Sequence, residues 1–150
     1  MKTVLITGAS RGIGRAIALR LGSEGYALAL HYRQQQAAAR SLLGELGAAG
    51  AQCRLLQFDI ADREQTAAVL SADIEAHGAY YGVVCNAGLN RDNAFPALSG
   101  EDWDVVVHTN LDGLYNVLHP LIMPMIRRRQ PGRIVTLSSV SGQVGTRGQV

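Results

Sequence analysis

The sequence predicts an α/β fold built on a doubly wound parallel sheet of about five strands. Short apolar runs alternate with segments of helical periodicity, and the first run enters its helix through a glycine-rich turn. Strands that alternate with helices pair in parallel through right-handed crossovers. The expected strands cover residues 3–7, 26–32, 52–58, 81–85 and 133–138, and the expected helices cover residues 12–24, 35–48, 62–77 and 101–129.

The composition fits one globular domain and gives no sign of a nucleic-acid or membrane partner. The 150 residues are 47% hydrophobic and 17% charged, with a net charge of +2, so residues 1–150 are expected to form one domain. Cys53 and Cys85 are the only cysteines, which argues against a disulfide framework. The short apolar start predicts no signal peptide, and no run approaches the ~20 residues of a membrane span. We therefore expect a soluble, cytoplasmic protein without a metal site.

The turn after the first strand has the properties of a phosphate-binding loop. Gly8, Gly12 and Gly14 lie where an apolar strand ends and a helical pattern begins. A dinucleotide pyrophosphate needs bare backbone N–H groups and the positive end of a helix dipole, and side chains would hold it at a distance. This spacing differs from the general G-x-G-x-x-G pattern, so the position between strand and helix carries the argument. A glycine-rich turn without a ligand remains the alternative.

Two arginines favour NADP over NAD as the dinucleotide. The second strand ends in Arg33, where NAD-binding proteins carry an acidic residue for the ribose 2′-hydroxyl. A guanidinium binds a 2′-phosphate through charge-assisted hydrogen bonds, whereas a carboxylate would repel it. Arg11, inside the glycine turn, adds a second positive charge. The alternative for both is a solvated surface arginine.

Several side chains predict how the helices begin and end. Asp62, with Gln65 three residues on, and Ser99, with Asp102 three residues on, are expected N-caps. Pro120 and Pro124 are expected to bend or split the long last helix, because each removes a backbone donor.

One polar residue interrupts the apolar stripe of the last helix. Asn110 falls among Trp103, Val106, Val107, Leu111, Leu114, Val117 and Leu118. An unpaired buried amide costs roughly 1–3 kcal/mol, so Asn110 is expected to have hydrogen-bond partners. Bonds to backbone groups alone remain an alternative to a catalytic role.

The chain resembles the short-chain dehydrogenase/reductases over its whole length. Thr7, Gly8, Gly12 and Gly14 match the Thr-Gly-x-x-x-Gly-x-Gly cofactor loop of that family, and an Asn-Ala-Gly sequence follows the fourth strand. The resemblance implies a Rossmann-like fold and an NADP site. The implied cofactor-binding residues are Thr7, Gly8, Ser10, Arg11, Gly12, Ile13, Gly14, Arg33, Asp59, Ile60, Asn86, Ala87 and Gly88. Asp59 would help to hold the adenine ring, although a turn aspartate bonding local backbone groups is an equal alternative.

The resemblance also implies catalytic residues. Ser139 matches the serine that polarises the substrate carbonyl, better than Ser138 or Ser141 does, and Asn110 matches the asparagine that binds a water of the proton relay. The family's general acid is a tyrosine, followed four residues later by a lysine, and both come after the serine. All five tyrosines here precede Ser139 and the only lysine is Lys2. We therefore expect the N-terminal part of a family domain, inactive as given, with its fifth strand at a sheet edge.

The implied activity is NADPH-dependent reduction of a 3-oxoacyl thioester, on acyl carrier protein or coenzyme A, to the 3-hydroxyacyl form, as in fatty acid biosynthesis. Residues 91–93 resemble the same loop of the 3-oxoacyl-carrier-protein reductases within the family. Arg127, Arg128 and Arg129 would offer a basic surface to the carrier or coenzyme A, or simply end their helix favourably. A complete family member is commonly a tetramer. A reductase of another ketone and a non-catalytic NADP-binding module remain alternatives.

Overall fold

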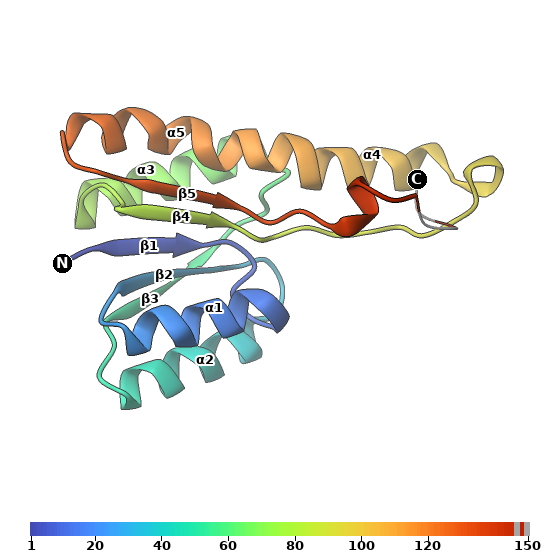
Figure 1. Ribbon diagram of the computed structural model, residues 1–150. Coiled ribbons are helices and arrows are strands. Elements are labelled where there is room, and N and C mark those ends of the chain that lie inside the picture. The colour runs from blue at the N-terminus through green and yellow to red at the C-terminus, as the bar shows by residue number, and fades with distance from the viewer. Residues whose placement is uncertain (146–147, 149–150) are drawn as a thin grey trace.

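In a computed structural model of the protein, residues 1–145 and 148 are described, and they form a five-stranded sheet with the order β3-β2-β1-β4-β5. All four strand pairings are parallel (Figure 1). The strands are β1 (Thr3–Ile6), β2 (Ala27–Tyr32), β3 (Cys53–Gln57), β4 (Gly82–Cys85) and β5 (Arg133–Thr136). The predicted α/β class and parallel sheet are therefore confirmed, with strand ends within two residues of those expected.

Helices cover both faces of the sheet. The helices α1 (Gly12–Ser23) and α2 (Gln36–Ala48) lie on one face, and α3 (Arg63–His77) and α5 (Gly113–Arg127) lie on the other (Figure 1). Alternate side chains of each strand face opposite layers. Thus Val4 and Ile6 belong to the core cluster under α1 and α2, whereas Leu5 belongs to the cluster under α3 and α5. Among the described residues, no helix is long and apolar enough to cross a membrane.

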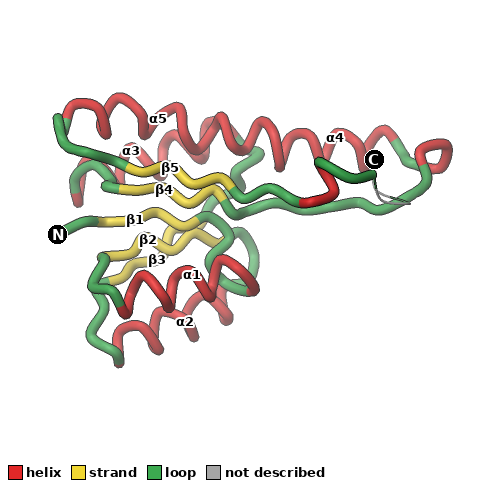
Figure 2. Tube along the Cα trace, in the orientation of Figure 1, coloured by secondary structure: helices red, strands yellow, loops and turns green. Residues whose placement is uncertain are grey.

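The chain order places a crevice beside β1. The strands progress outward from β1 through β2 to β3, and the chain then returns to the other side of β1 as β4. Open α/β sheets bind ligands at this reversal, outside the carboxyl ends of the strands. Figure 2 shows the loops after β1, β4 and β5 leaving the sheet at the same edge. The strand order therefore brings the residues after β1 and β4 together.

The last predicted helix is interrupted, and the interruption is not at its prolines. It consists of α4 (Gly100–Val107), a π-helical turn (His108–Asp112) and α5. The prediction that Pro120 or Pro124 splits the helix is wrong, because α5 runs through both. The two prolines are four residues apart and share a face, while Leu121 and Met125 on α5 stay buried against the sheet. Packing thus maintains the helix despite two missing donors.

The apolar stripe around Asn110 is less buried than its spacing predicted. Trp103 is 49% exposed and Leu111 is 65% exposed, and Asn110 itself is exposed. Two features explain the difference. The π turn changes the helical period, so the stripe does not stay on one face, and α4 projects beyond the strand ends (Figure 1). The expectation that Asn110 has hydrogen-bond partners is confirmed, because its side chain bonds the backbone of Leu89.

The predicted helix starts are confirmed in their main contacts. The Asp62 carboxylate accepts a hydrogen bond from Gln65 N (2.9 Å), and Ser99 Oγ accepts one from Asp102 N (3.0 Å). The side chain of Gln65 does not complete a reciprocal capping box. Its Oε1 accepts from Asp59 N (2.6 Å) instead, which ties the start of α3 to the loop after β3.

Within the described residues, β5 forms one edge of the sheet. It pairs with β4 alone, from Gly82 opposite Arg133 to Cys85 opposite Thr136, and all four of its residues are exposed. The expected edge position of this strand is confirmed.

Candidate functional site

Two adjoining cavities open at the carboxyl ends of the strands. The serine cavity, about 460 Å³, extends toward the loop after β5, and the arginine cavity, about 340 Å³, extends toward the end of β2. The glycine turn and the loop after β4 lie between them. Six residues line both cavities and make them continuous, namely Ile13, Ile60, Asn86, Ala87, Gly88 and Leu89.

The glycine turn after β1 needs its glycines for two different reasons. A Cβ on Gly14 would lie against the Gly8 carbonyl and 2.5 Å from Asn86 Nδ2, so only a bare Cα fits there. Gly12 has open space but a φ of +56°, a conformation that favours glycine. Gly12 begins α1, whose first N–H groups lack partners within the helix. The turn therefore packs closely against its surroundings at Gly14, while the backbone at Gly12 stays open and positively polarised.

Thr7 and Asn86 connect the ends of β1 and β4. Thr7 is 2% exposed, and its Oγ1 accepts hydrogen bonds from Asn86 N and Ala87 N, both at 3.0 Å, while donating to Val84 O (3.3 Å). In return, Asn86 Nδ2 donates to Thr7 O (2.9 Å) and Gly8 O (3.1 Å). These bonds fix the glycine turn relative to the loop after β4 before any ligand enters.

The arginine cavity brings the predicted positive charges together with one carboxylate. Ser10, Arg11, Arg33 and Asp59 all line it. The Arg33 guanidinium lies 3.4 Å from an Asp59 oxygen, and the other Asp59 oxygen accepts from Ala61 N (3.0 Å). Asp59 therefore does form the local turn contact that was the alternative to ligand binding, and it also orients Arg33 toward the cavity.

Buried polar contacts hold the backbone of Ile60, between the two cavities. Asn116, on α5 and 2% exposed, donates from Nδ2 to Ile60 O (2.9 Å). Its Oδ1 accepts from Arg63 Nε (2.9 Å). Gly113 leaves room for this contact, since a Cβ there would lie 2.8 Å from Ile60 Cδ1. The α5 helix thus supports the wall that both cavities share.

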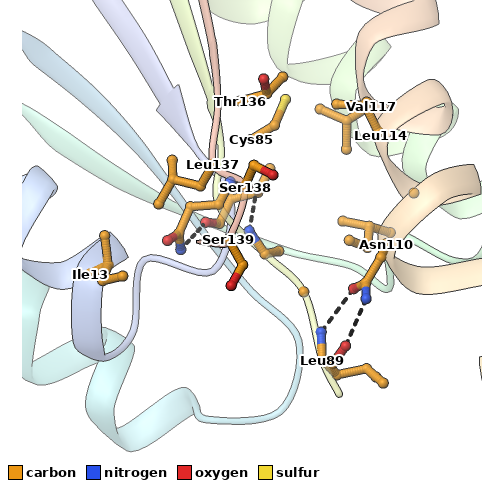
Figure 3. Close-up of a pocket in the computed structure, with 16 residues that line it drawn as sticks. Ile13, Cys85, Leu89, Asn110, Leu114, Val117, Thr136, Leu137, Ser138 and Ser139 are labelled. Atoms are coloured by element: carbon orange, nitrogen blue, oxygen red, sulfur yellow. Dashed lines mark hydrogen bonds between the residues drawn. The ribbon is translucent and has the colours of Figure 1, made fainter. Parts of the chain in front are cut away.

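Ser139 and Asn110 meet at the serine cavity from opposite sides. Figure 3 shows Ser139 on the loop after β5 and Asn110 on the facing helix, with Leu89 below. Asn110 Oδ1 accepts from Leu89 N (2.9 Å) and Nδ2 donates to Leu89 O (2.7 Å). A Cβ on Gly88 would lie 3.0 Å from Asn110 Oδ1, so the glycine permits this approach. Ser139 Oγ accepts from Ser141 N (3.2 Å) and is exposed.

His31 is a part of the site that the sequence analysis did not assign. It is 2% exposed on β2, lines the arginine cavity, and accepts a hydrogen bond from Gly8 N at its Nδ1 (3.1 Å). Burial lowers its pKa from 6.5 to about 4, so the ring is neutral at physiological pH. The available signal was an ionisable residue inside an otherwise apolar strand that ends at the ligand edge.

Cys85 is a second unassigned residue of the site. It is the last residue of β4, is a free thiol, and lines the serine cavity. Burial raises the pKa of its thiol to about 11, so it is a neutral and unreactive part of the wall.

The arginines at the end of α5 are not part of either cavity. They lie at the amino ends of the strands, away from the cavities, where α5 ends and the chain turns into β5 (Figure 1). Arg128 donates to Tyr80 O (2.7 Å) and lies 5.9 Å from the Tyr81 ring. Arg127 is a basic residue in the last turn of α5, as expected for a helix-end role, and Arg129 has a φ of 50°.

Comparison with known sequences accounts for this geometry. The pattern of the short chain dehydrogenase family matches residues 2–150. The chain belongs to the short-chain dehydrogenase family. The predicted resemblance is confirmed, and this family generally uses a nicotinamide cofactor.

Individual short-chain dehydrogenases are similar over nearly the whole chain. A 3-oxoacyl-acyl-carrier-protein reductase FabG of Aggregatibacter actinomycetemcomitans is 60% identical over 149 residues, which are 99% of this chain and 62% of the relative. A FabG of Staphylococcus aureus is 39% identical over 148 residues, 99% of this chain and 60% of the relative. An acetoacetyl-CoA reductase of Paracoccus denitrificans is 39% identical over 142 residues, 95% of this chain and 56% of the relative. The chain spans about 60% of the length of these relatives.

Proposed function

We propose that the protein is an NADPH-dependent reductase of 3-oxoacyl thioesters, and that these 150 residues carry its cofactor site and part of its catalytic site. The observation that supports this most strongly is the continuity of the two cavities. One holds paired arginines, the other holds a serine and an asparagine, and the glycine turn lies between them. The relatives at 60% and 39% identity are named as 3-oxoacyl-carrier-protein reductases, which supports the substrate class.

The residues present fit a dinucleotide along these cavities. The N-terminus of α1, with Gly12 and Ile13, would bind the pyrophosphate, because its free N–H groups and dipole attract anions. Asp59 and Ile60 would border the adenine, and Asn86, Ala87 and Gly88 would lie along the nicotinamide ribose side. NADPH, when bound, supplies a hydride to the carbonyl carbon of the substrate.

Arg33 and Arg11 would select NADPH over NADH. Both line the arginine cavity, and the contact of Arg33 with Asp59 (3.4 Å) would keep the guanidinium close to a bound adenosine ribose. A 2′-phosphate carries more charge than a hydroxyl and accepts charge-assisted bonds from both guanidinium groups.

Ser139 would donate a hydrogen bond to the substrate carbonyl oxygen. Ser139 is exposed and lines the serine cavity, where a donor would stabilise the negative charge that develops on that oxygen. Asn110 would hold the facing helix in place through Leu89 and support the proton relay. The tyrosine and lysine of the family have no counterpart after Ser139 in these residues. We therefore expect residues 1–150 alone not to turn over substrate.

Docking of the acyl carrier is a separate part of the proposal. Arg127 and Arg129 are exposed and basic, as an acidic carrier requires, whereas Arg128 is engaged with Tyr80 and Tyr81. The Paracoccus relative is named as an acetoacetyl-CoA reductase, so coenzyme A is the second candidate carrier. We also propose a cytoplasmic location and a tetrameric assembly of the whole protein.

The proposal is tested with the full-length protein that contains these residues. The assay measures NADPH and NADH oxidation with acetoacetyl thioesters of acyl carrier protein and of coenzyme A. We expect turnover with NADPH, and Arg33→Ala to raise the KM for NADPH about tenfold while leaving NADH unchanged. Arg40→Ala is the matched control, since Arg40 is an exposed arginine on α2 outside the cavities. Turnover of another ketone alone, or NADPH binding without any turnover, would refute the proposed reaction.

A further inference from the structure

His31 connects three segments of the cofactor site with one buried ring. Its Nδ1 accepts from Gly8 N (3.1 Å), its Nε2 lies 2.9 Å from Phe58 O, and its own carbonyl accepts from Ala9 N (2.9 Å). The ring also packs on Phe58, with 4.1 Å between ring centroids. The glycine turn after β1 and the end of β3 are thus joined through a side chain of β2.

These contacts permit a single form of the imidazole. The Gly8 N–H group requires a lone pair on Nδ1, and Phe58 O requires a proton on Nε2. Only the neutral tautomer with the proton on Nε2 meets both requirements. Protonation of Nδ1 would place two donors against each other, and because His31 is only 2% exposed, water has little access to relieve the conflict.

The Gly8 contact decides how the glycine turn begins. Gly8 has a φ of +66°, and its carbonyl accepts from Asn86 Nδ2 (3.1 Å). Gly8 is therefore held by His31 through its N–H group and by Asn86 through its carbonyl. Gly14, at the start of α1, packs directly against the Gly8 carbonyl, so the position of Gly8 sets that of the helix N-terminus.

We propose that His31 is a positioning residue for cofactor binding: its Nδ1 fixes the Gly8 peptide and thereby the pyrophosphate-binding end of α1. This inference rests on the proposed NADPH site, which it deepens. In this role His31 acts on the ligand indirectly, because its two ring nitrogens bond the backbone of Gly8 and Phe58. Its effect on the reaction passes through Gly8.

Two amide substitutions separate the two bonds of the ring. Asparagine ends near the place of Nδ1 and keeps an acceptor for Gly8 N–H. Glutamine reaches the place of Nε2 and keeps a donor for Phe58 O. We expect His31→Asn to leave the dissociation constant of NADPH within about threefold of wild type, and His31→Gln to weaken binding about tenfold or more, because an unpaired buried N–H remains. The loss in His31→Gln should appear in the KM for NADPH more than in the kcat.

The test uses the purified full-length protein. Fluorescence titration measures NADPH binding, and NMR measures hydrogen exchange of the Gly8 amide in the absence of cofactor. The proposal expects faster Gly8 exchange and weaker NADPH binding in His31→Gln than in His31→Asn. Equal losses in the two variants would mean that the ring only fills space, and would overturn it. If the wild-type protein binds no NADPH, the proposed function fails. The rates of Gly8 amide exchange in His31→Gln and His31→Asn then decide alone whether His31 positions the turn.

Discussion

The glycine turn and the outer wall of the serine cavity, where Ser139 and Asn110 lie, are supported in opposite ways. The residues that hold the glycine turn are buried: Thr7, which lines the serine cavity, and His31, which lines the arginine cavity, are each 2% exposed, and their side chains bond the backbone of neighbouring segments. At the outer wall, Ser139 and Asn110 are exposed, and β5 and α4 are at least partly exposed along their whole length. The first region is built into the core of the sheet, and the second is attached to its surface.

This difference separates binding from chemistry in mutational terms. A change near the glycine turn disturbs contacts that also stabilise the fold, so it should lower both stability and cofactor affinity. A change at Ser139 or Asn110 removes few buried contacts and should affect mainly turnover. Each substitution below tests whether the two regions respond in this way.

The largest effect is expected from Gly14→Ala. The new Cβ would overlap the Gly8 carbonyl and lie 2.5 Å from Asn86 Nδ2, so the turn must move. We expect a loss of about 3 kcal/mol in the free energy of unfolding and no measurable NADPH binding. Urea unfolding and NADPH titration measure the two effects.

The control is Gly44→Ala on α2, where a Cβ meets nothing within 4 Å. This substitution should stabilise the protein by about 0.5–1 kcal/mol. A Gly14→Ala protein that still binds NADPH would contradict the role of the turn.

Ser139→Ala should change turnover and leave the fold intact. Loss of the hydroxyl removes the proposed donor to the carbonyl oxygen, which lowers kcat about 100- to 1000-fold. The unfolding free energy should change by less than about 0.5 kcal/mol, because Ser139 is exposed. Ser138→Ala is the matched control, since Ser138 lines the same cavity, and it should stay near wild-type kcat. An equal loss in both variants would show that the wrong serine has been assigned.

Stability should depend on pH through the buried region. The pKa of His31 is about 4 in the folded protein, whereas an unperturbed histidine has a pKa of 6.5. Between these values the unfolded chain binds the extra proton, so stability falls as pH falls, by about 1.4 kcal/mol per pH unit and about 3 kcal/mol in all. Asp59 raises this pKa and Arg33 lowers it, both less than burial does. Urea unfolding of wild type and His31→Asn between pH 4 and 6.5 isolates the effect, and parallel curves would contradict it.

The sequence predicted the regular parts of this molecule and many residues that line the two cavities, but not the hydrogen bonds that hold those residues in place. Alternating apolar runs gave the strands, and the glycine spacing gave the turn, because both reflect local chain geometry. The bond from Gly8 to His31 spans 23 residues and that from Asn86 to Thr7 spans 79, so no local pattern contains them. The π turn at residues 108–112 was missed for a related reason. The Asn110 side chain in this turn bonds the Leu89 backbone. A helical period in the sequence cannot predict such a long-range contact.

Two asparagines, one at each of these regions, lose the same side-chain amide on substitution by alanine. Asn86 Nδ2 donates to Thr7 O and Gly8 O at the partly buried junction of β1 and β4, and Asn110 bonds the exposed Leu89 backbone. Asn86→Ala should lower the free energy of unfolding by about 2 kcal/mol, because two carbonyls lose their donor where water enters poorly. Asn110→Ala should cost less than about 1 kcal/mol, since water replaces the lost bonds. Urea unfolding of the two variants measures the difference. Equal losses would mean that the helical segment carrying Asn110 is as firmly supported as the glycine turn, and the distinction between these two regions would fail.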